Sequence, residues 1–302
     1  MVKVDLITGF LGSGKTTFIK KYARYLMEQG QNIGILENDF GAINVDMMLL
    51  RELEMVAGGC DKDCYRRRFK TKLIAMGMCG YDRVLIEPSG IFDVDDFFDA
   101  LHEEPLDRWY QIGNVITVVD ASLEKTLSKE ADYVLASEVA NAGCVLLSKT
   151  QDASAEEIRQ TVAHLNRALQ EIHCSRVLKD EVICKDWEDF TEKEFKKILE
   201  SGYLVEDYEK LYVDQDEIFQ TLFFMDEKID VSKAKHAAKK IFEDPACGGV
   251  LRIKGFLQDG ENWLELNATQ HEISLKPIGA GQDVLIIIGE KLNEEKIRYY
   301  LE

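Results

Sequence analysis

Runs of consecutive apolar residues alternate with helical patterns over residues 1–172. The apolar runs predict short buried strands near residues 2–7, 32–38, 82–90, 113–121 and 142–150. Between and after them, apolar residues recur every three or four positions, which predicts helices over 15–29, 62–77, 92–102, about 130–140 and 155–171. Strands that are apolar throughout suit a parallel sheet covered by helices on both faces. We therefore expect an α/β domain with a doubly wound, mostly parallel sheet.

The pattern changes after about residue 216, where a strand and a helix are followed by four strand-like segments and a closing helix. Short turns separate these segments, which predicts a small α+β domain over residues 216–302. Residues 173–215 contain a strand-like stretch, a short helix behind a capping box of Thr191 and Glu194, and an acidic, tyrosine-rich stretch. We expect this segment to connect the nucleotide-binding domain, residues 1–172, to the small domain.

The stretch between the first strand and the first helix, "GFLGSGKTT", is rich in glycine and carries one lysine. It fits the pattern G-x-x-x-x-G-K-[ST], in which backbone N–H groups form a concavity that cradles phosphate oxygens. In this pattern Lys15 contacts the β- and γ-phosphates, and Thr16 is a ligand of Mg²⁺. The residues expected to bind the triphosphate are Gly9, Gly12, Ser13, Gly14, Lys15, Thr16 and Thr17. A glycine-rich turn that fits by chance is the alternative, and the flanking strand and helix argue against it.

The formal net charge of −18 over 302 residues argues against two classes of partner. Nucleic acids and anionic membrane surfaces both favour clustered Lys and Arg. The sequence contains no run of about 18 apolar residues, so we expect no transmembrane helix. The N-terminus begins with a strand rather than a signal peptide, so we expect a cytoplasmic protein. The seven cysteines, an odd number in such a chain, do not indicate a disulfide framework.

Several motifs occur in an order that resembles the CobW family of P-loop GTPases, relatives of the metallochaperones HypB and UreG. They are "TGFLGSGKTT" (8–17), "ILENDFGAINVD" (35–46), "GGC" (58–60), "RVLIEPSGI" (83–91), "NVITVVDA" (114–121), "VLRIKGFL" (250–257) and "LIIIGEKL" (285–292). The first is common to P-loop proteins, whereas the combination is specific. The resemblance covers essentially the whole chain and implies a GTP-binding hydrolase that uses Mg²⁺.

The resemblance also implies roles for acids near the expected γ-phosphate. Glu87 ends the third apolar run and would hold Mg²⁺ through water, while the backbone N–H of Gly90 would meet the γ-phosphate. Asp46 falls where the first switch of the family offers an acid near the metal. With Lys15 and Thr16, the residues Glu87 and Gly90 complete the expected catalytic set.

A second metal site is implied by "GGCDKDCYRRR", in which three residues separate Cys60 from Cys64. The family usually carries Cys-x-Cys-Cys here, so the motif is incomplete, but two thiols at this spacing remain suited to Zn²⁺. Glu37 matches a family acid near those cysteines. Together Glu37, Cys60 and Cys64 would bind Zn²⁺ or another transition metal and leave one position open. Two free thiols beside a loop are the alternative.

The stretch expected to read the base, "SKTQD" at 148–152, departs from the family pattern Asn-Lys-x-Asp. Lys149 can still lay its apolar stem on a purine ring. Gln151 offers one acceptor and one NH₂ donor, a pair complementary to adenine. The resemblance favours GTP, with Asp152 shifted into place, and ATP is the alternative.

We therefore expect a slow GTPase, or ATPase, that acts as a metallochaperone or a metal- or cofactor-insertion factor. Hydrolysis would be coupled to a switch segment near Cys60 and Cys64. Turnover is expected to be slow because no residue suited to orient the attacking water, and no certain arginine finger, is identifiable. The expected client is a metalloenzyme or a corrinoid protein. The alternative is a nucleotide-gated docking switch for such a client, without a metal site of its own.

Overall fold

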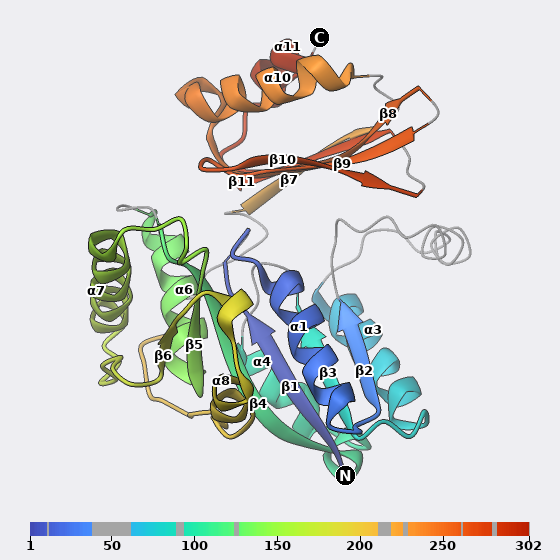
Figure 1. Ribbon diagram of the computed structural model, residues 1–302, viewed down its shortest axis with the longest axis vertical. Helices are drawn as coiled ribbons and strands as arrows, with labels where there is room; N and C mark the ends of the chain where they lie inside the picture. The colour runs from blue at the N-terminus through green and yellow to red at the C-terminus, as the bar shows by residue number, and fades with distance from the viewer. Residues whose placement is uncertain are drawn as a thin grey trace. The chain divides into compact units, whose positions relative to one another are not determined.

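The computed structural model describes residues 1–10, 12–37, 62–88, 94–123, 127–210, 219–225, 229–260, 262–279 and 283–301. Contacts between residues divide the chain into two compact units, Met1–Leu211 and Tyr212–Glu302. Figure 1 shows the elements of both units. Among the described helices, none has both the length and the apolar character needed to cross a lipid bilayer.

The first unit is built on a six-stranded sheet whose paired strands all run parallel, in the order β2-β3-β1-β4-β5-β6. Its strands are β1 (Val2–Thr8), β2 (Ile33–Glu37), β3 (Arg83–Glu87), β4 (Tyr110–Asp120), β5 (Cys144–Ser148) and β6 (Val182–Cys184). Its helices are α1 (Lys15–Glu28), α3 (Lys62–Gly77), α4 (Val94–His102), α5 (Leu106–Trp109), α6 (Lys129–Asn141), α7 (Ala155–Glu171) and α8 (Glu192–Leu199), with the 3₁₀ turn η1 (Trp187–Asp189). The predicted doubly wound, parallel sheet is confirmed.

Helices cover both faces of this sheet. On one face α1, η1 and α8 pack on alternate strand residues, in a buried cluster that includes Ile7, Phe18, Ile116, Trp187 and Ile198. Side chains alternate across a strand, so the neighbour of Ile116 in β4, Thr117, faces the opposite side. There its hydroxyl donates to the backbone carbonyl of Glu138 in α6, at 3.0 Å. Both faces of the sheet are therefore covered by helices, as the continuous apolar runs predict.

A buried polar network joins the elements that carry the glycine-rich loop. Asp5 of β1 accepts hydrogen bonds from Arg83 Nη1 at 2.6 Å and from the Tyr22 hydroxyl at 3.0 Å. The backbone N–H of Asn114 donates to the same carboxylate at 2.9 Å. Burial, and then the neighbouring Asp5 charge, raise the pKa of Tyr22, so its phenol stays a donor. The network therefore fixes β1, β3, β4 and α1 relative to one another.

One helix of the first unit was not expected from the sequence. Helix α5 spans only Leu106–Trp109, which is too short to show a helical period. Strand β6 forms within the strand-like stretch of the segment expected to be a connector, and its parallel pairing with β5 makes it part of the first sheet. In the same segment, the capping box of Thr191 and Glu194 begins α8 as predicted, with the Thr191 N–H donating to the Glu194 carboxylate at 2.8 Å.

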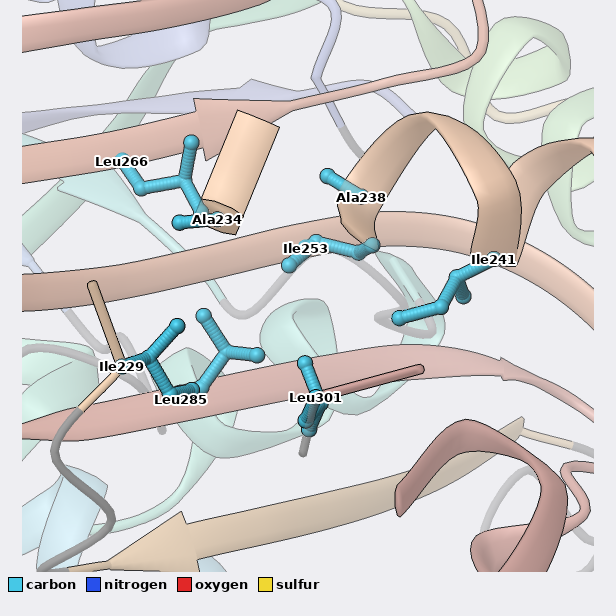
Figure 2. Close-up of a pocket in the computed structure, with 8 residues that line it drawn as sticks. All are labelled: Ile229, Ala234, Ala238, Ile241, Ile253, Leu266, Leu285 and Leu301. Carbon is cyan, nitrogen blue, oxygen red and sulfur yellow. The ribbon is translucent and has the colours of Figure 1, made fainter. Parts of the chain in front are cut away.

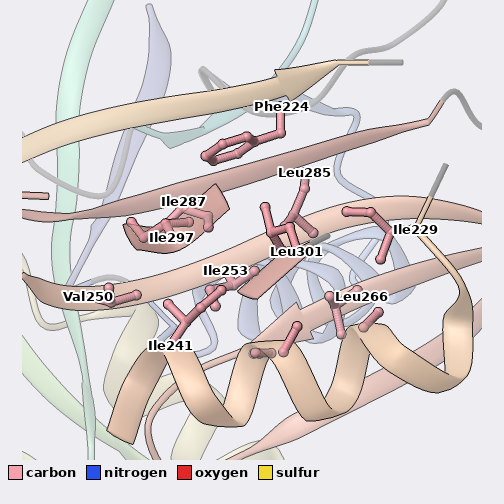
Figure 3. Packing of buried hydrophobic residues seen from close by; sticks show 14 of the residues in the cluster. Phe224, Ile229, Ile241, Val250, Ile253, Leu266, Leu285, Ile287, Ile297 and Leu301 are labelled. Atoms are coloured by element: carbon pink, nitrogen blue, oxygen red, sulfur yellow. The ribbon is translucent and has the colours of Figure 1, made fainter. Parts of the chain in front are cut away.

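The second unit is an antiparallel five-stranded sheet in the order β10-β9-β8-β11-β7, with helices on one face (Figure 3). Its elements are β7 (Phe219–Met225), α10 (Val231–Glu243), the 3₁₀ turn η2 (Pro245–Cys247), β8 (Gly249–Asp259), β9 (Asn262–Ala268), β10 (Ile273–Ile278), β11 (Val284–Glu290) and α11 (Glu294–Leu301). Ala234, Ala238 and Ile241 of α10 face Ile253 and Leu285 of the sheet (Figure 2), and the space between them does not admit a water molecule. This seam is packed core and not a ligand site.

Candidate functional site

The glycine-rich loop takes a backbone course that only glycine allows at its two ends. Gly9 has φ +136°, and a Cβ there would lie 2.1 Å from the carbonyl oxygen of Val118. Gly14 has φ +96°, and a Cβ there would meet the Trp187 ring at 3.4 Å. Positive φ and close backbone approach are the two situations that select glycine. The loop is therefore pressed against β4 on one side and against η1 on the other.

Helix α1 begins directly at the end of this loop, at Lys15. Within the part of the chain that the structure describes, no side chain caps this end and its first turn carries no acid. The first N–H groups of a helix have no partner inside it, and the helix dipole adds partial positive charge there. The Thr16 and Thr17 side chains of the same turn are exposed. This end of the helix is thus suited to phosphate oxygens.

Two buried side chains of the loop supply further donors. Lys15 is only 6% exposed, and its ammonium donates to the carbonyl oxygens of Gly9 at 2.7 Å and Phe10 at 3.3 Å. The Ser13 hydroxyl is buried and has no hydrogen-bond partner among the described residues. A buried polar atom without a partner is costly. A phosphate in the concavity would give Ser13 an acceptor, which fits the predicted triphosphate.

Thr16 and Glu87 come together as a magnesium site requires. The Thr16 hydroxyl donates to the two Glu87 carboxylate oxygens at 2.9 and 3.0 Å. Glu87 ends β3, which pairs in parallel with β1, so its carboxylate lies at the same edge of the sheet as the loop. Hydroxyl and carboxylate oxygens beside bound phosphates are the ligands that Mg²⁺ uses in nucleotide enzymes. The residues present therefore fit the ion.

The residues expected to hold a transition metal lie mostly outside the described part of the chain. Asp46, Cys60 and Gly90 are not described, nor are the side chains of Glu37 and Cys64. The backbone places Glu37 at the end of β2, paired in register with Glu87, and Cys64 in the first turn of α3. Among the described residues no three His, Cys, Asp or Glu side chains form a metal cluster.

The segment expected to read the base lies beside the loop, since the Ser148 Cβ is 3.7 Å from where a Gly14 Cβ would be. Lys149 has φ +54°, and its ammonium pairs with Asp120 at 2.7 Å. Gln151 and Asp152 are both exposed, and the Gln151 amide nitrogen donates to Asp152 Oδ2 at 2.9 Å. A carboxylate therefore lies next to Gln151 in this segment.

Gln151→Asp is expected to raise the preference for GTP over ATP by about 1–3 kcal/mol, the range for one good bidentate pair with a base. A carboxylate accepts from both N–H groups of guanine, whereas the Gln151 amide offers one acceptor and one donor. Competition binding of GTP and ATP measures the ratio. Gln170→Asp, at an exposed position of α7, adds the same charge elsewhere and serves as the control. A wild-type protein that already excludes ATP would show that Asp152, or the backbone, reads the base.

Three residues of this site were missed in the sequence analysis. Asp120, the partner of Lys149, ends the apolar run "NVITVVD", and that position at the carboxyl end of a parallel strand was a usable signal. Trp187 packs on Gly14, and Glu138 of α6 is a buried acid whose pKa is raised by burial and lowered by the nearby Lys15 charge. Neither has a local signal, because a tryptophan in a turn and an acid in a helix are ordinary.

Comparison with known proteins identifies the group to which the chain belongs. The family model "CobW/HypB/UreG, nucleotide-binding domain" matches residues 3–176. The zinc chaperone YjiA of Escherichia coli (strain K12) is 27% identical over 321 residues, which cover 98% of this chain and 96% of that protein. The zinc-regulated GTPase metalloprotein activator 1 of Schizosaccharomyces pombe is 25% identical over 184 residues. The aligned region covers 55% of this chain and 44% of that protein.

Among solved structures, the crystal structure of Zn(II)-bound YjiA GTPase from E. coli covers 100% of this chain and 99% of its own, at 21% identity and a TM-score of 0.39. The family model spans more than half of this chain and includes the glycine-rich loop, Glu87 and Lys149. The protein belongs to the CobW/HypB/UreG family and carries the nucleotide-binding domain of that family.

Proposed function

We propose that this protein is a slow GTPase that uses Mg²⁺ and handles a transition metal for a client protein. The observation that carries the proposal is the contact of Thr16 with Glu87 at the mouth of the glycine-rich loop. It joins the first turn of α1 to the end of β3, where a hydroxyl and a carboxylate meet beside the expected phosphates. Membership of the CobW/HypB/UreG family supports the same assignment.

In this proposal the residues of the chain divide the work of binding. The backbone of Gly9, Gly12 and Gly14, with Ser13 and Thr17, surrounds the phosphates, and the Lys15 ammonium offsets charge on the β- and γ-phosphates. Thr16 would hold Mg²⁺ directly and Glu87 through a water molecule, with Asp46 nearby. When bound, the ion would neutralise charge on the β- and γ-phosphate oxygens. The Gly90 N–H would contact the γ-phosphate.

The base is proposed to be guanine, held by Lys149 and by the neighbouring pair of Gln151 and Asp152. The ion pair of Lys149 with Asp120 supports this, because it fixes the aliphatic stem on which a purine would stack. Because Gln151 stands where the family has an acid, ATP remains the competing nucleotide, and the Gln151→Asp experiment distinguishes the two.

The metal is proposed to bind Glu37, Cys60 and Cys64, as Zn²⁺ or another transition metal. The register of β2 with β3 supports coupling to the nucleotide, because Glu37 is paired with Glu87 and Glu87 accepts a hydrogen bond from Thr16. Two relatives are named a zinc chaperone and a zinc-regulated GTPase metalloprotein activator. By analogy, the client would be a metalloenzyme or a corrinoid protein.

The magnesium site gives a direct test of the nucleotide half of the proposal. Glu87→Gln is expected to lower GTP hydrolysis at limiting Mg²⁺ by about 10- to 100-fold, the usual cost of losing a residue that orients a metal ligand. Excess Mg²⁺ should restore part of the rate. Released phosphate, measured across a Mg²⁺ titration, gives both values, and Glu171→Gln at the exposed end of α7 is the control. Equal Mg²⁺ requirements for Glu87→Gln and wild type would remove Glu87 from the site.

A further inference from the structure

A tryptophan ring faces the end of the glycine-rich loop. The Cη2 and Cζ3 atoms of Trp187 lie 3.4 and 3.6 Å from where a Gly14 Cβ would be, which is ordinary van der Waals contact. The same ring packs edge-on against the ring of Phe18, with 5.6 Å between the ring centroids and 61° between the ring planes. The Phe18 N–H donates to the Gly14 carbonyl oxygen at 3.0 Å. Trp187 therefore packs on both residues joined by the hydrogen bond that closes the first turn of α1.

The 3₁₀ turn that carries Trp187, η1, is itself fastened to α1. The Lys21 ammonium donates to the Trp187 carbonyl oxygen at 3.0 Å and pairs with the Glu188 carboxylate at 2.9 Å. Within the turn, the Glu188 N–H donates to the Asp186 carboxylate at 2.9 Å. Trp187 is only 9% exposed. Its ring is therefore held in one place against the loop.

The two ends of the loop are held by different kinds of contact. At the start, the close neighbour of Gly9 is the backbone of β4, since a Gly9 Cβ would lie 2.1 Å from the Val118 carbonyl oxygen. At the end, Gly14 has φ +96°, and within the described part of the chain no side chain caps it. A glycine imposes no conformation of its own, because it has no Cβ. Packing by Trp187 thus restricts the backbone at Gly14.

The conformation of Gly14 decides where the phosphate-binding groups point. The N–H groups at the beginning of α1, which would meet the phosphates, follow directly from this residue. The Lys15 side chain leaves the backbone at the next position, and its ammonium lies 2.7 Å from the Gly9 carbonyl oxygen, inside the loop. A rotation of the backbone at Gly14 would therefore turn both the N–H groups and the lysine away from a bound triphosphate.

We propose that Trp187 is a positioning residue for nucleotide binding. Its ring keeps Gly14 in the conformation that directs the loop N–H groups and the Lys15 ammonium toward the phosphates. In this role Trp187 acts through Gly14 and not by contact with the nucleotide. The inference rests on the proposed function, because it requires that this loop binds a triphosphate.

Trp187→Phe separates this role from the packing of the core. A phenylalanine ring can still pack against Phe18, but it is shorter and lacks Cη2 and Cζ3, the two atoms that face Gly14. The indole Nε1 has no hydrogen-bond partner among the described residues, so the exchange removes no hydrogen bond within them. We expect the dissociation constant for a non-hydrolysable GTP analogue with Mg²⁺ to rise about tenfold, since a displacement of about 1 Å can cost up to about 100-fold in function.

Calorimetric titration gives the dissociation constant and the number of binding sites separately. A merely structural role would lower the fraction of folded protein, and hence the number of sites, with the dissociation constant unchanged. Leu26→Val is the matched control, because Leu26 is fully buried in the same cluster near the far end of α1. It should lower the melting temperature and bind the analogue with the wild-type dissociation constant.

The possible outcomes separate the inference from the function on which it rests. Trp187→Phe that binds the analogue as tightly as the wild type would overturn the inference alone. An equal loss of affinity in Leu26→Val would also overturn it, because the effect would then come from general loosening of α1. Absence of analogue binding by the wild type would overturn the proposed function together with the inference.

Discussion

Lys15→Ala is expected to lose at least about 100-fold in affinity for a GTP analogue, measured by calorimetric titration. A hydrogen bond to a charged group contributes about 1.5–3 kcal/mol, and Lys15 would make such contacts to both the β- and the γ-phosphate. Every 1.4 kcal/mol lost is tenfold in affinity. In the structure the Lys15 ammonium already lies inside the loop, at 2.7 Å from the Gly9 carbonyl oxygen.

The control for this experiment is Lys20→Ala, an exposed lysine on the same helix. It removes an equal charge from α1 without touching the loop, so it should bind the analogue like the wild type. Lys15→Ala also removes the group that offsets the Glu138 charge, and burial favours protonation of that acid instead. We therefore expect the variant to stay folded, which thermal unfolding checks. Full affinity in a folded Lys15→Ala protein would end the assignment of this loop to triphosphate binding.

The second large effect is expected in metal binding. Changing Cys60 and Cys64 together to Ser should abolish stoichiometric Zn²⁺ binding and leave nucleotide affinity intact. Chelator competition, with and without the GTP analogue, measures Zn²⁺ affinity in both states. Because Glu37 is paired in register with Glu87, nucleotide should change Zn²⁺ affinity, and Zn²⁺ must then change nucleotide affinity by the same factor. Thiolate ligands lose their protons on binding, so Zn²⁺ affinity should fall as pH falls.

Two other cysteines provide the matched control. Cys79 and Cys184 are exposed free thiols, and changing both to Ser removes the same number of sulfur atoms. This variant should bind Zn²⁺ like the wild type. A wild-type protein that binds no stoichiometric metal, or binds it equally with and without nucleotide, would contradict the metallochaperone proposal. Hydrolysis stimulated by a client protein and not by metal would then identify a docking switch.

Several features of the fold follow from residues that lie close together in the sequence. The glycine-rich loop is encoded by neighbouring residues, so its course and the start of α1 at Lys15 follow from the sequence. The same holds for α7, where Ser154 and Glu157 form a capping box, with a 2.8 Å bond from the Ser154 N–H to the Glu157 carboxylate. Apolar runs predicted the parallel strands because a sheet covered on both faces leaves them no polar positions. Each of these features depends on residues within a few positions of one another.

Tertiary structure alone decided which distant side chains meet around the loop. Thr16 and Glu87 are separated by 71 positions, and their contact depends on the pairing of β1 with β3. Glu138 is buried because α6 packs on the face of β4 that Thr117 presents. An acid within a helix carries no local mark of burial, since its environment is set by the elements that pack against it. The protonation and the partners of such a group are therefore properties of the fold and not of the local sequence.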